Sequence, residues 1–402
     1  LTDLPTPRGV PVLGNLLDAD PTRLHLTLER WAAELGSPYL LRLGPQKFFV
    51  SADADQLQSV LRERPERYRR LKKMADCIEE LGGHGVFSVE GEAWRPQRKL
   101  VMEALNATHF RAFLPVIHGI TLRLLQRWQR AAAAGETVEM TQDLIRYTVD
   151  VTTALAFGED PNTLETDGDV IQNHLAELFP RLMARINAPF PYWRYVKLPA
   201  DHRLDRALAQ VHRHIDRLIA STRQRMAAAP GKPPANVLEA MLTAAADPQS
   251  QISDADVRAN VQTLLLAGED TTAHTLAWTM YHLAQSPSWQ DRLHAQVREA
   301  IGTEPLPATV EALRQLDLLE SAANEATRLK PIVPLFFLEP LADVVLDGVE
   351  LPAGTPMIFL LRPSMLDETR FGDPLAFRPE RWQHGQAPGA HAAPAPQPGA
   401  PT

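Results

Sequence analysis

The sequence predicts a mainly helical fold with a small β-sheet region, and three features of its pattern indicate this. Apolar residues recur every three or four positions in several long runs, which is the spacing of one face of an α-helix. The clearest run, from Asp254 to Gln285, would form a helix on the order of 45 Å long, enough to cross a domain. Two short apolar runs at 39–43 and 47–51, separated by Gly44-Pro45, are typical of a β-hairpin.

The other elements follow in chain order. Residues 1–20 are rich in Pro and Gly and form an irregular lead-in. Ser253 followed by Asp256 is a helix-start pattern for the long helix, and Ser286-Pro287 is a stop. Apolar spacing predicts further helices at about 115–134, 137–157, 165–188, 201–228, 235–245, 288–301, 308–314 and 317–330. Residues 335–361 alternate and turn like a small β region.

Composition divides the chain after Trp382. Residues 1–382 read as one large domain, although 402 residues would also suffice for two. Residues 383–402 contain five Pro, six Ala and three Gly without apolar periodicity, so we expect a flexible tail or linker there.

Charge and cysteine content exclude several classes of protein. The net charge of −8 leaves no basic excess to neutralise phosphates, so we expect no nucleic-acid partner. Cys77 is the single cysteine, which rules out an intrachain disulfide and favours a cytoplasmic setting. No stretch is apolar for long enough to cross a bilayer, so we expect no membrane anchor. We expect a monomer.

The long helix is interrupted in its middle by weak helix formers. Gly268, Asp270, Thr271 and Thr272 together cost about 2 kcal/mol relative to Ala. A threonine hydroxyl can also bond the carbonyl one turn back and bend a helix. The segment therefore predicts either a groove that accommodates a ligand or a kink between packed helices, and the residues alone leave both open.

Three further segments carry charged side chains at helical spacing. Glu325 and Arg328 share a helix face and suit a bidentate ion pair, although an exposed pair worth little is the alternative. Trp94 and Arg98 lie one turn apart and could offer an indole N–H and a guanidinium to an anion, or belong to a solvated first turn. A turn at residues 377–382 carries another arginine, Arg381.

Taken in order, the four segments resemble the cytochrome P450 family, and the resemblance runs from Leu4 to Trp382. It implies haem b (iron protoporphyrin IX) as cofactor and a monooxygenase that inserts one oxygen atom of O2 into an organic substrate. Electrons would come from NAD(P)H through a ferredoxin and its reductase, or through a fused reductase. The segment 332–338, which matches a pocket-lining segment of the family, is strongly apolar, so an apolar small-molecule substrate is expected.

The resemblance assigns four residues to cofactor binding. Trp94 and Arg98 match the pair that binds the haem propionates. Ala267 and Gly268 match the positions that open the long helix over the haem. Two departures affect the propionate contacts: Met365 stands where many relatives carry His, and Leu338 where many carry Arg.

Five more residues take catalytic or structural roles by the same resemblance. Asp270 and Thr271 match the acid–alcohol pair that delivers protons to iron-bound oxygen. Glu325, Arg328 and Arg381 match a buried ion triad that braces the haem-binding core on its proximal side. Such a triad is structural, and we expect its members to be buried and within hydrogen-bonding distance of one another.

The family's axial ligand is missing from the sequence. A glycine-rich loop ending in the ligand cysteine, and a final helix, should follow the Pro-Glu-Arg turn, but residues 383–402 contain no cysteine. Cys77 has acidic neighbours and matches a stretch on the opposite, distal side. We therefore expect a P450 fold truncated before the ligand loop, with no metal ligand of its own. The alternative is a truncated, non-catalytic pseudo-monooxygenase or binding protein. An all-helical terpene-cyclase type of lyase is disfavoured because no paired Asp-rich metal motif is present.

Overall fold

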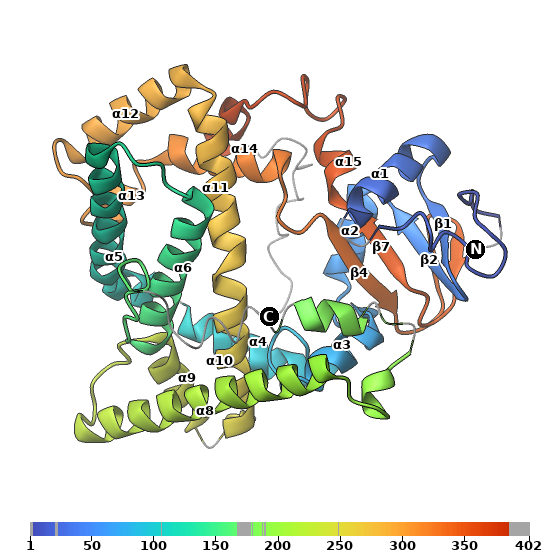
Figure 1. Ribbon diagram of the computed structural model, residues 1–402, viewed down its shortest axis with the longest axis horizontal. Coiled ribbons are helices and arrows are strands. Elements are labelled where there is room, and N and C mark those ends of the chain that lie inside the picture. The colour runs from blue at the N-terminus through green and yellow to red at the C-terminus, as the bar shows by residue number, and fades with distance from the viewer. Residues whose placement is uncertain are drawn as a thin grey trace, which may run out of the picture.

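The computed structural model describes residues 3–20, 23–105, 107–166, 178, 180–186, 188, 190–247 and 249–385. The fold is mainly helical with a small mixed sheet, as the sequence predicts. Figure 1 shows the sheet with α1 and α2 on one side of the molecule and a helical part on the other. Between them α10 and α11 rise through the molecule, and α8 runs along its lower edge in this view.

The sheet has five strands in the order β1-β2-β7-β4-β3, and a separate pair is formed by β5 and β6. The predicted hairpin is present as antiparallel β1 and β2, while β2 pairs in parallel with β7 from the far end of the chain. Asp347 and Gly348 both have positive φ and turn the chain between β5 and β6. The strands are β1 (Tyr39–Leu43), β2 (Gln46–Ser51), β3 (Tyr68–Arg70), β4 (Leu335–Pro340), β5 (Val344–Leu346), β6 (Val349–Leu351) and β7 (Met357–Leu360).

Most of the predicted helices are present within a few residues of their expected bounds. The segment expected as a helix at 165–188 lies largely outside the described residues. The helices that begin before residue 200 are α1 (Leu24–Leu35), α2 (Ala54–Arg62), α3 (Lys72–Glu79), α4 (Trp94–Ala104), α5 (Ala107–Ala134), α6 (Met140–Phe157) and α8 (Pro199–Ala228). Those after it are α9 (Val237–Ala245), α10 (Asp254–Gly268), α11 (Asp270–Ala284), α12 (Pro287–Ile301), α13 (Val310–Leu313), α14 (Asp317–Leu329) and α15 (Leu361–Met365). Three short 3₁₀ helices are η1 (Gly91–Ala93), η2 (Tyr192–Arg194) and η3 (Pro379–Gly385).

Sequence periodicity missed the bounds of several N-terminal elements. Helices α1, α2 and α3 are short and were not predicted. The predicted start of α5 at Pro115 is wrong, because the helix begins at Ala107 and Pro115 lies inside it. An interior proline costs about 3 kcal/mol, but here its neighbours Phe113 and Leu114 are buried, and packing offsets the lost hydrogen bond.

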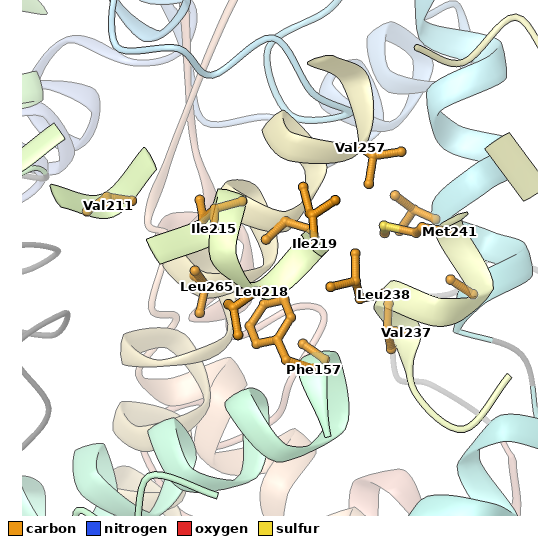
Figure 2. Close-up of a cluster of buried hydrophobic side chains, with 14 of the residues drawn as sticks. Phe157, Val211, Ile215, Leu218, Ile219, Val237, Leu238, Met241, Val257 and Leu265 are labelled. Atoms are coloured by element: carbon orange, nitrogen blue, oxygen red, sulfur yellow. The ribbon is translucent and has the colours of Figure 1, made fainter. Parts of the chain in front are cut away.

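The largest hydrophobic core lies between α8, α9, α10 and the C-terminal end of α6. Figure 2 shows Ile215 and Leu218 of α8 facing Leu265 of α10, with Phe157 below them. Two smaller cores cover the opposite faces of the sheet, one of them around Phe49 and the other around Trp31. The helical core thus fixes α10 against α8 and α6, and so positions the segment that the sequence singles out.

The long helix predicted at 254–285 is divided into α10 and α11. Ser253 and Asp256 form the expected capping box at its start. The break falls at Glu269, whose ψ of −77° departs from helical values. At this point α6 approaches closely, and a Cβ on Gly268 would lie 2.6 Å from Thr152 Oγ1. Glycine at this position therefore lets α10 and α6 meet.

The close approach of Gly268 predicts the effect of adding a methyl group there. We expect Gly268→Ala to lower the free energy of unfolding by about 1–3 kcal/mol, because Thr152 is β-branched and stiff and must shift. In a Thr152→Ala background, the nearest remaining atom lies 3.3 Å away, so most of this loss should disappear. Urea unfolding of the two single variants and the double variant measures the coupling; purely additive losses would contradict the contact.

Candidate functional site

The helix break brings a set of hydroxyl groups onto the backbone around Glu269. Thr148 of α6 donates its hydroxyl to the Glu269 carbonyl at 3.1 Å. Thr271 donates its hydroxyl to the Ala267 carbonyl at 2.8 Å, one turn back. The bond from Thr148 adds to the one that the Glu269 carbonyl already accepts from the Ala273 N–H at 3.2 Å, and the bond from Thr271 follows the pattern of a hydroxyl that donates one turn back. The predicted weak spot is therefore a real interruption, and side-chain hydroxyls hold its backbone.

Side chains at the break are exposed to solvent, whereas a side chain one turn further along α11 is buried. Ala267, Asp270 and Thr271 are exposed, whereas Ala273 one turn further on is fully buried. Asp270 lies in the first turn of α11, where a carboxylate is favoured by the helix dipole. The break thus presents an acid and an alcohol, adjacent in sequence, on an accessible stretch of an otherwise packed helix pair.

Glu269, between Gly268 and Asp270, was not singled out from the sequence. Burial raises the pKa of its carboxyl to about 7, and the neighbouring charge of Asp270 adds to the shift. A carboxyl with such a pKa exchanges protons near neutral pH. Two adjacent acids in the sequence were a visible signal, but only the fold shows which of them is withdrawn from water.

A second constellation is centred on Glu325 of α14, which is fully buried. Arg328 donates from Nε and Nη2 to its two carboxylate oxygens, each at 2.8 Å. Arg381 of η3 donates from Nε to Glu325 Oε1 at 3.3 Å. The side chain of Arg328 is 1% exposed and that of Arg381 11%. The predicted contact of both arginines with Glu325 is confirmed, and the exposed-pair alternative is wrong for Glu325 and Arg328.

The triad has further donors and acceptors that sequence reasoning missed. The backbone N–H of Arg378 and the indole N–H of Trp382 both donate to Glu325, at 2.9 Å. Arg328 also donates from Nη1 to the carbonyls of Met365 and Pro374, at 2.7 and 2.8 Å. The sequence motif Pro-Glu-Arg-aromatic contains Trp382, but it does not indicate that the indole N–H donates to Glu325. The Glu325 carboxylate and its partner Arg328 therefore connect α14 to the chain between residues 365 and 382.

Burial and hydrogen bonding act in opposite directions on Glu325. Burial alone would raise the pKa of its carboxyl. The hydrogen bonds from Arg328, the Arg378 N–H and Trp382, together with the charge of Arg328, favour the ionised form and bring the pKa below its ordinary value. The carboxylate thus stays charged inside the protein.

The predicted anion-binding pair begins α4. Arg98 lies 5.9 Å from the centre of the Trp94 ring, so the two side chains are adjacent. The Trp94 indole N–H donates to the Val86 carbonyl at 3.2 Å, and the Arg98 side chain is exposed. Arg98 is thus free to meet an anion, whereas the indole N–H would first have to leave Val86.

Arg70 is a further cation that sequence reasoning did not select. It lies on β3 opposite Leu338, and its guanidinium stacks 4.4 Å from the Phe87 ring. Burial, followed by the charge of Arg64, lowers its pKa to about 10. Its buried Nη1 lies 3.7 Å from Glu90 and makes no hydrogen bond to any described residue. This is a second guanidinium with spare donor capacity.

Cys77 does not have the surroundings of a metal-binding thiolate. It is 2% exposed and packs against Ala188 and Trp193. Burial, and then the charge of Glu80, raises the pKa of its thiol, which disfavours the thiolate. Among the residues that the structure describes, no group of three His, Cys, Asp or Glu side chains is arranged to hold a metal ion.

Comparison with known proteins identifies the architecture. The family model described as "Cytochrome P450" matches residues 4–395. The chain belongs to the cytochrome P450 family. The order of a helix-break acid–alcohol pair, a buried Glu–Arg pair and a Pro-Glu-Arg turn is thus a family pattern in this chain, and the P450 fold predicted from it is confirmed.

Individual relatives are distant. The chain is 28% identical over 349 residues to cytochrome P450 CYP94D108 of Paris polyphylla, covering 83% of this chain and 68% of that protein. It is 28% identical over 321 residues to human cytochrome P450 4F8, covering 75% of this chain and 61% of that protein. It is also 26% identical over 396 residues to the bifunctional cytochrome P450/NADPH–P450 reductase ALT2 of Alternaria alternata, covering 94% of this chain and 34% of that protein. The matched part of this chain thus covers about two thirds of the length of the first two relatives and about a third of the length of the third.

The residues fit part of a P450 haem site and do not fit the rest. Arg98 and Arg70 are cations with donors available for carboxylates, and Ala267 to Thr271 form an accessible break in the central helix pair. The axial thiolate is not supplied, because Cys77 is the single cysteine of the sequence and is buried against Trp193. No helix within the described ranges is long and apolar enough to cross a membrane.

The Glu325 network predicts a large and pH-dependent loss on neutralisation. Glu325→Gln should lower the free energy of unfolding at neutral pH by about 3–5 kcal/mol, because the buried guanidinium of Arg328 and the half-buried one of Arg381 lose their counter-charge. Since the folded pKa of Glu325 lies below the ordinary 4.5, its contribution is complete above that pH and is lost as pH falls through the folded pKa. The difference between wild type and variant should therefore narrow in acid.

Urea unfolding from neutral pH to well below 4.5 measures this loss and its dependence on pH. Glu320→Gln, at an exposed position on the same helix, serves as the matched control and should change stability by less than about 0.5 kcal/mol. Equal effects of the two substitutions would contradict the role of the buried network.

Proposed function

We propose that this P450 chain forms the substrate-facing and core part of a haem-dependent monooxygenase that acts on an apolar organic substrate. The observation that carries the proposal is the helix break at Glu269, which leaves Asp270 and Thr271 accessible in a P450 fold. The proposal requires an axial thiolate, a role to which Cys77 is unsuited. When bound with such a ligand, haem would supply the activation of O2.

The residues of this chain would hold the cofactor's edges and manage protons. Arg98 and Arg70 would neutralise the two propionate carboxylates, because each guanidinium keeps donors without a hydrogen bond to the described part of the chain. The Thr271 hydroxyl, now bonded to the Ala267 carbonyl, would rotate to donate a proton towards the reacting oxygen. Asp270, exposed beside it, would resupply that proton from solvent.

The segment that resembles a pocket-lining part of the family supports the choice of an apolar substrate. The segment from Ile332 to Leu338 carries no charged residue, and its Phe336 and Phe337 are half-buried on β4. Apolar walls with few polar groups favour apolar ligands. Electrons would come from NAD(P)H through a ferredoxin system or a fused reductase, and one relative of this chain is named as a fusion with an NADPH–P450 reductase.

A second function is favoured by the state of Cys77. If no further segment supplies a thiolate, the chain would act as a binding protein of P450 fold without oxygen chemistry. The two functions differ in one property, which is the presence of a thiolate on the iron. Comparison of the wild-type chain with Cys77→Ser tests whether Cys77 supplies that thiolate.

The 402-residue chain supplied with haem should give no thiolate-type Soret band in its reduced, CO-bound spectrum. The reason is that a buried thiol with a raised pKa disfavours the thiolate needed as a ligand. Cys77→Ser should leave the spectrum unchanged. A thiolate-type band that disappears in Cys77→Ser would overturn the assignment of Cys77 as a core residue.

In a haem-loaded protein that carries the thiolate, Thr271→Ala should keep substrate binding but lower product formed per NAD(P)H by at least about tenfold, with the electrons recovered as peroxide. The Thr271 hydroxyl would act on proton supply, so its removal should lower product formed per NAD(P)H and leave substrate binding unchanged. Thr275→Ala is the matched control, because Thr275 makes the same bond to a carbonyl one turn back, at 2.8 Å. Unchanged coupling in Thr271→Ala would refute the proton-delivery role.

A further inference from the structure

The outer face of α8 carries a row of arginines at a regular spacing. They follow one another at intervals of three, seven and four residues, so they lie along one side of the helix over about 21 Å. The members of this arginine stripe are all exposed: Arg203, Arg206, Arg213 and Arg217. In Figure 1 α8 runs along the lower edge of the molecule, and its other side packs into the largest hydrophobic core. The arginine stripe therefore faces solvent along its length.

The charge of the stripe is not compensated by the carboxylates of its own helix. α8 has three aspartates, and each of them accepts a hydrogen bond from a cation that lies outside α8. The pairs are Asp201 with Arg185 at 3.2 Å, Asp205 with Lys197 at 2.5 Å and Asp216 with Arg258 at 2.7 Å. No member of the stripe forms an ion pair with a carboxylate in the described part of the chain. Tertiary contacts thus remove the acids that could have neutralised the stripe.

The arginines within the stripe repel one another. Arg203 and Arg206 lie three residues apart, and Arg213 and Arg217 lie four apart, so both pairs are neighbours on the helix surface. Like charges at these spacings destabilise a helix. Arg217 donates from Nε to the carbonyl of Arg213 at 3.4 Å, but a neutral carbonyl leaves both guanidinium groups without a counter-charge. An anionic partner along the stripe would replace this repulsion by attraction.

The spacing of the stripe fits a second helix lying beside α8. Positions 203, 206, 210, 213, 217, 220 and 224 continue a seven-residue repeat, which is the spacing at which one α-helix meets another along its length. Gln210, Ala220 and Gln224 fill the positions that arginine does not occupy, and all three are exposed. These residues supply no apolar seam, so charge would decide which helix binds.

The composition of α8 favours a protein partner over a lipid surface or a nucleic acid. The helix contains six arginines and no lysine, and protein interfaces are enriched in arginine and depleted in lysine. No large apolar side chain of α8 is exposed, whereas a helix that lies on a membrane inserts an apolar face. The net charge of −8 disfavours a phosphate backbone.

We propose that the arginine stripe docks an acidic α-helix of a partner protein, whose Asp and Glu side chains recur every three or four residues along one side. Each guanidinium can donate two parallel hydrogen bonds to a carboxylate, which fixes the register of the two helices as well as attracting them. The inference requires neither haem nor catalytic activity.

The probe is a fluorescein-labelled peptide with three repeats of Glu-Ala-Ala-Glu-Ala-Ala-Ala, which places its glutamates on one side of a helix. The comparison peptide has the same composition, with its glutamates distributed around the helix. Fluorescence anisotropy with the 402-residue chain at about 50 mM salt should show at least about tenfold tighter binding of the first peptide, as expected for several exposed ion pairs acting together. Salt of about 300 mM should remove most of this preference, because exposed charges are screened.

Neutral substitutions in the stripe should weaken binding of the first peptide. Arg213→Gln with Arg217→Gln should lower its affinity about threefold, and Gln at all four stripe positions should lower it to that of the comparison peptide. Arg213→Lys with Arg217→Lys keeps the charge and should stay within about twofold of wild type. Arg30→Gln with Arg62→Gln is the matched control, because it changes the net charge equally at exposed positions of α1 and α2, and it should leave the affinity unchanged.

Two kinds of result would overturn the proposal. Equal affinity for the two peptides, or an equal loss in the matched control, would show a response to net charge and not to the stripe. Tighter binding of phosphatidylglycerol vesicles or duplex DNA than of the first peptide, abolished by Gln at all four stripe positions, would assign the stripe to another class of partner.

Discussion

The carboxylate of Glu325 is the interaction on which the C-terminal part of the structure depends. It is fully buried and receives hydrogen bonds from Arg328, Arg381, Trp382 and the backbone of Arg378. A charge in this position is tolerated only because every lone pair finds a donor. Arg328 in turn caps carbonyls at 365 and 374, so a chain segment with little regular structure is held against α14.

A second constraint acts where α6 meets the central helix pair. Close approach at Gly268, the Thr148 bond to the Glu269 carbonyl and the Thr271 bond to Ala267 together define where the helix stops and starts again. The consequence is chemical as well as geometric. Glu269 is withdrawn from water with a pKa of about 7, while Asp270 and Thr271 remain accessible. Adjacent residues thus receive opposite environments from a single interruption.

Both constraints belong to one frame. α14 packs against α11, and α11 packs against α6, so the buried triad and the helix break sit on neighbouring helices. α4 joins the frame through Gln97, which bonds to Asp256 and Asn260 of α10. The frame therefore places Trp94 and Arg98 at one end and the triad at the other.

The sequence by itself determined the family, the hairpin, most of the helices and the members of the triad, because each depends on local spacing or on a fixed order of motifs. A capping box such as Ser253 and Asp256 involves residues three apart, and Glu325 and Arg328 share one turn. Tertiary structure alone decided the partners of Arg381 and Trp382, the spare donors of Arg70 and the burial of Glu269. It also decided that Trp94 donates its indole N–H to the Val86 carbonyl. These properties arise where segments distant in sequence exclude water from one another, and no local pattern of residues encodes which charges will be desolvated or which donors will be met.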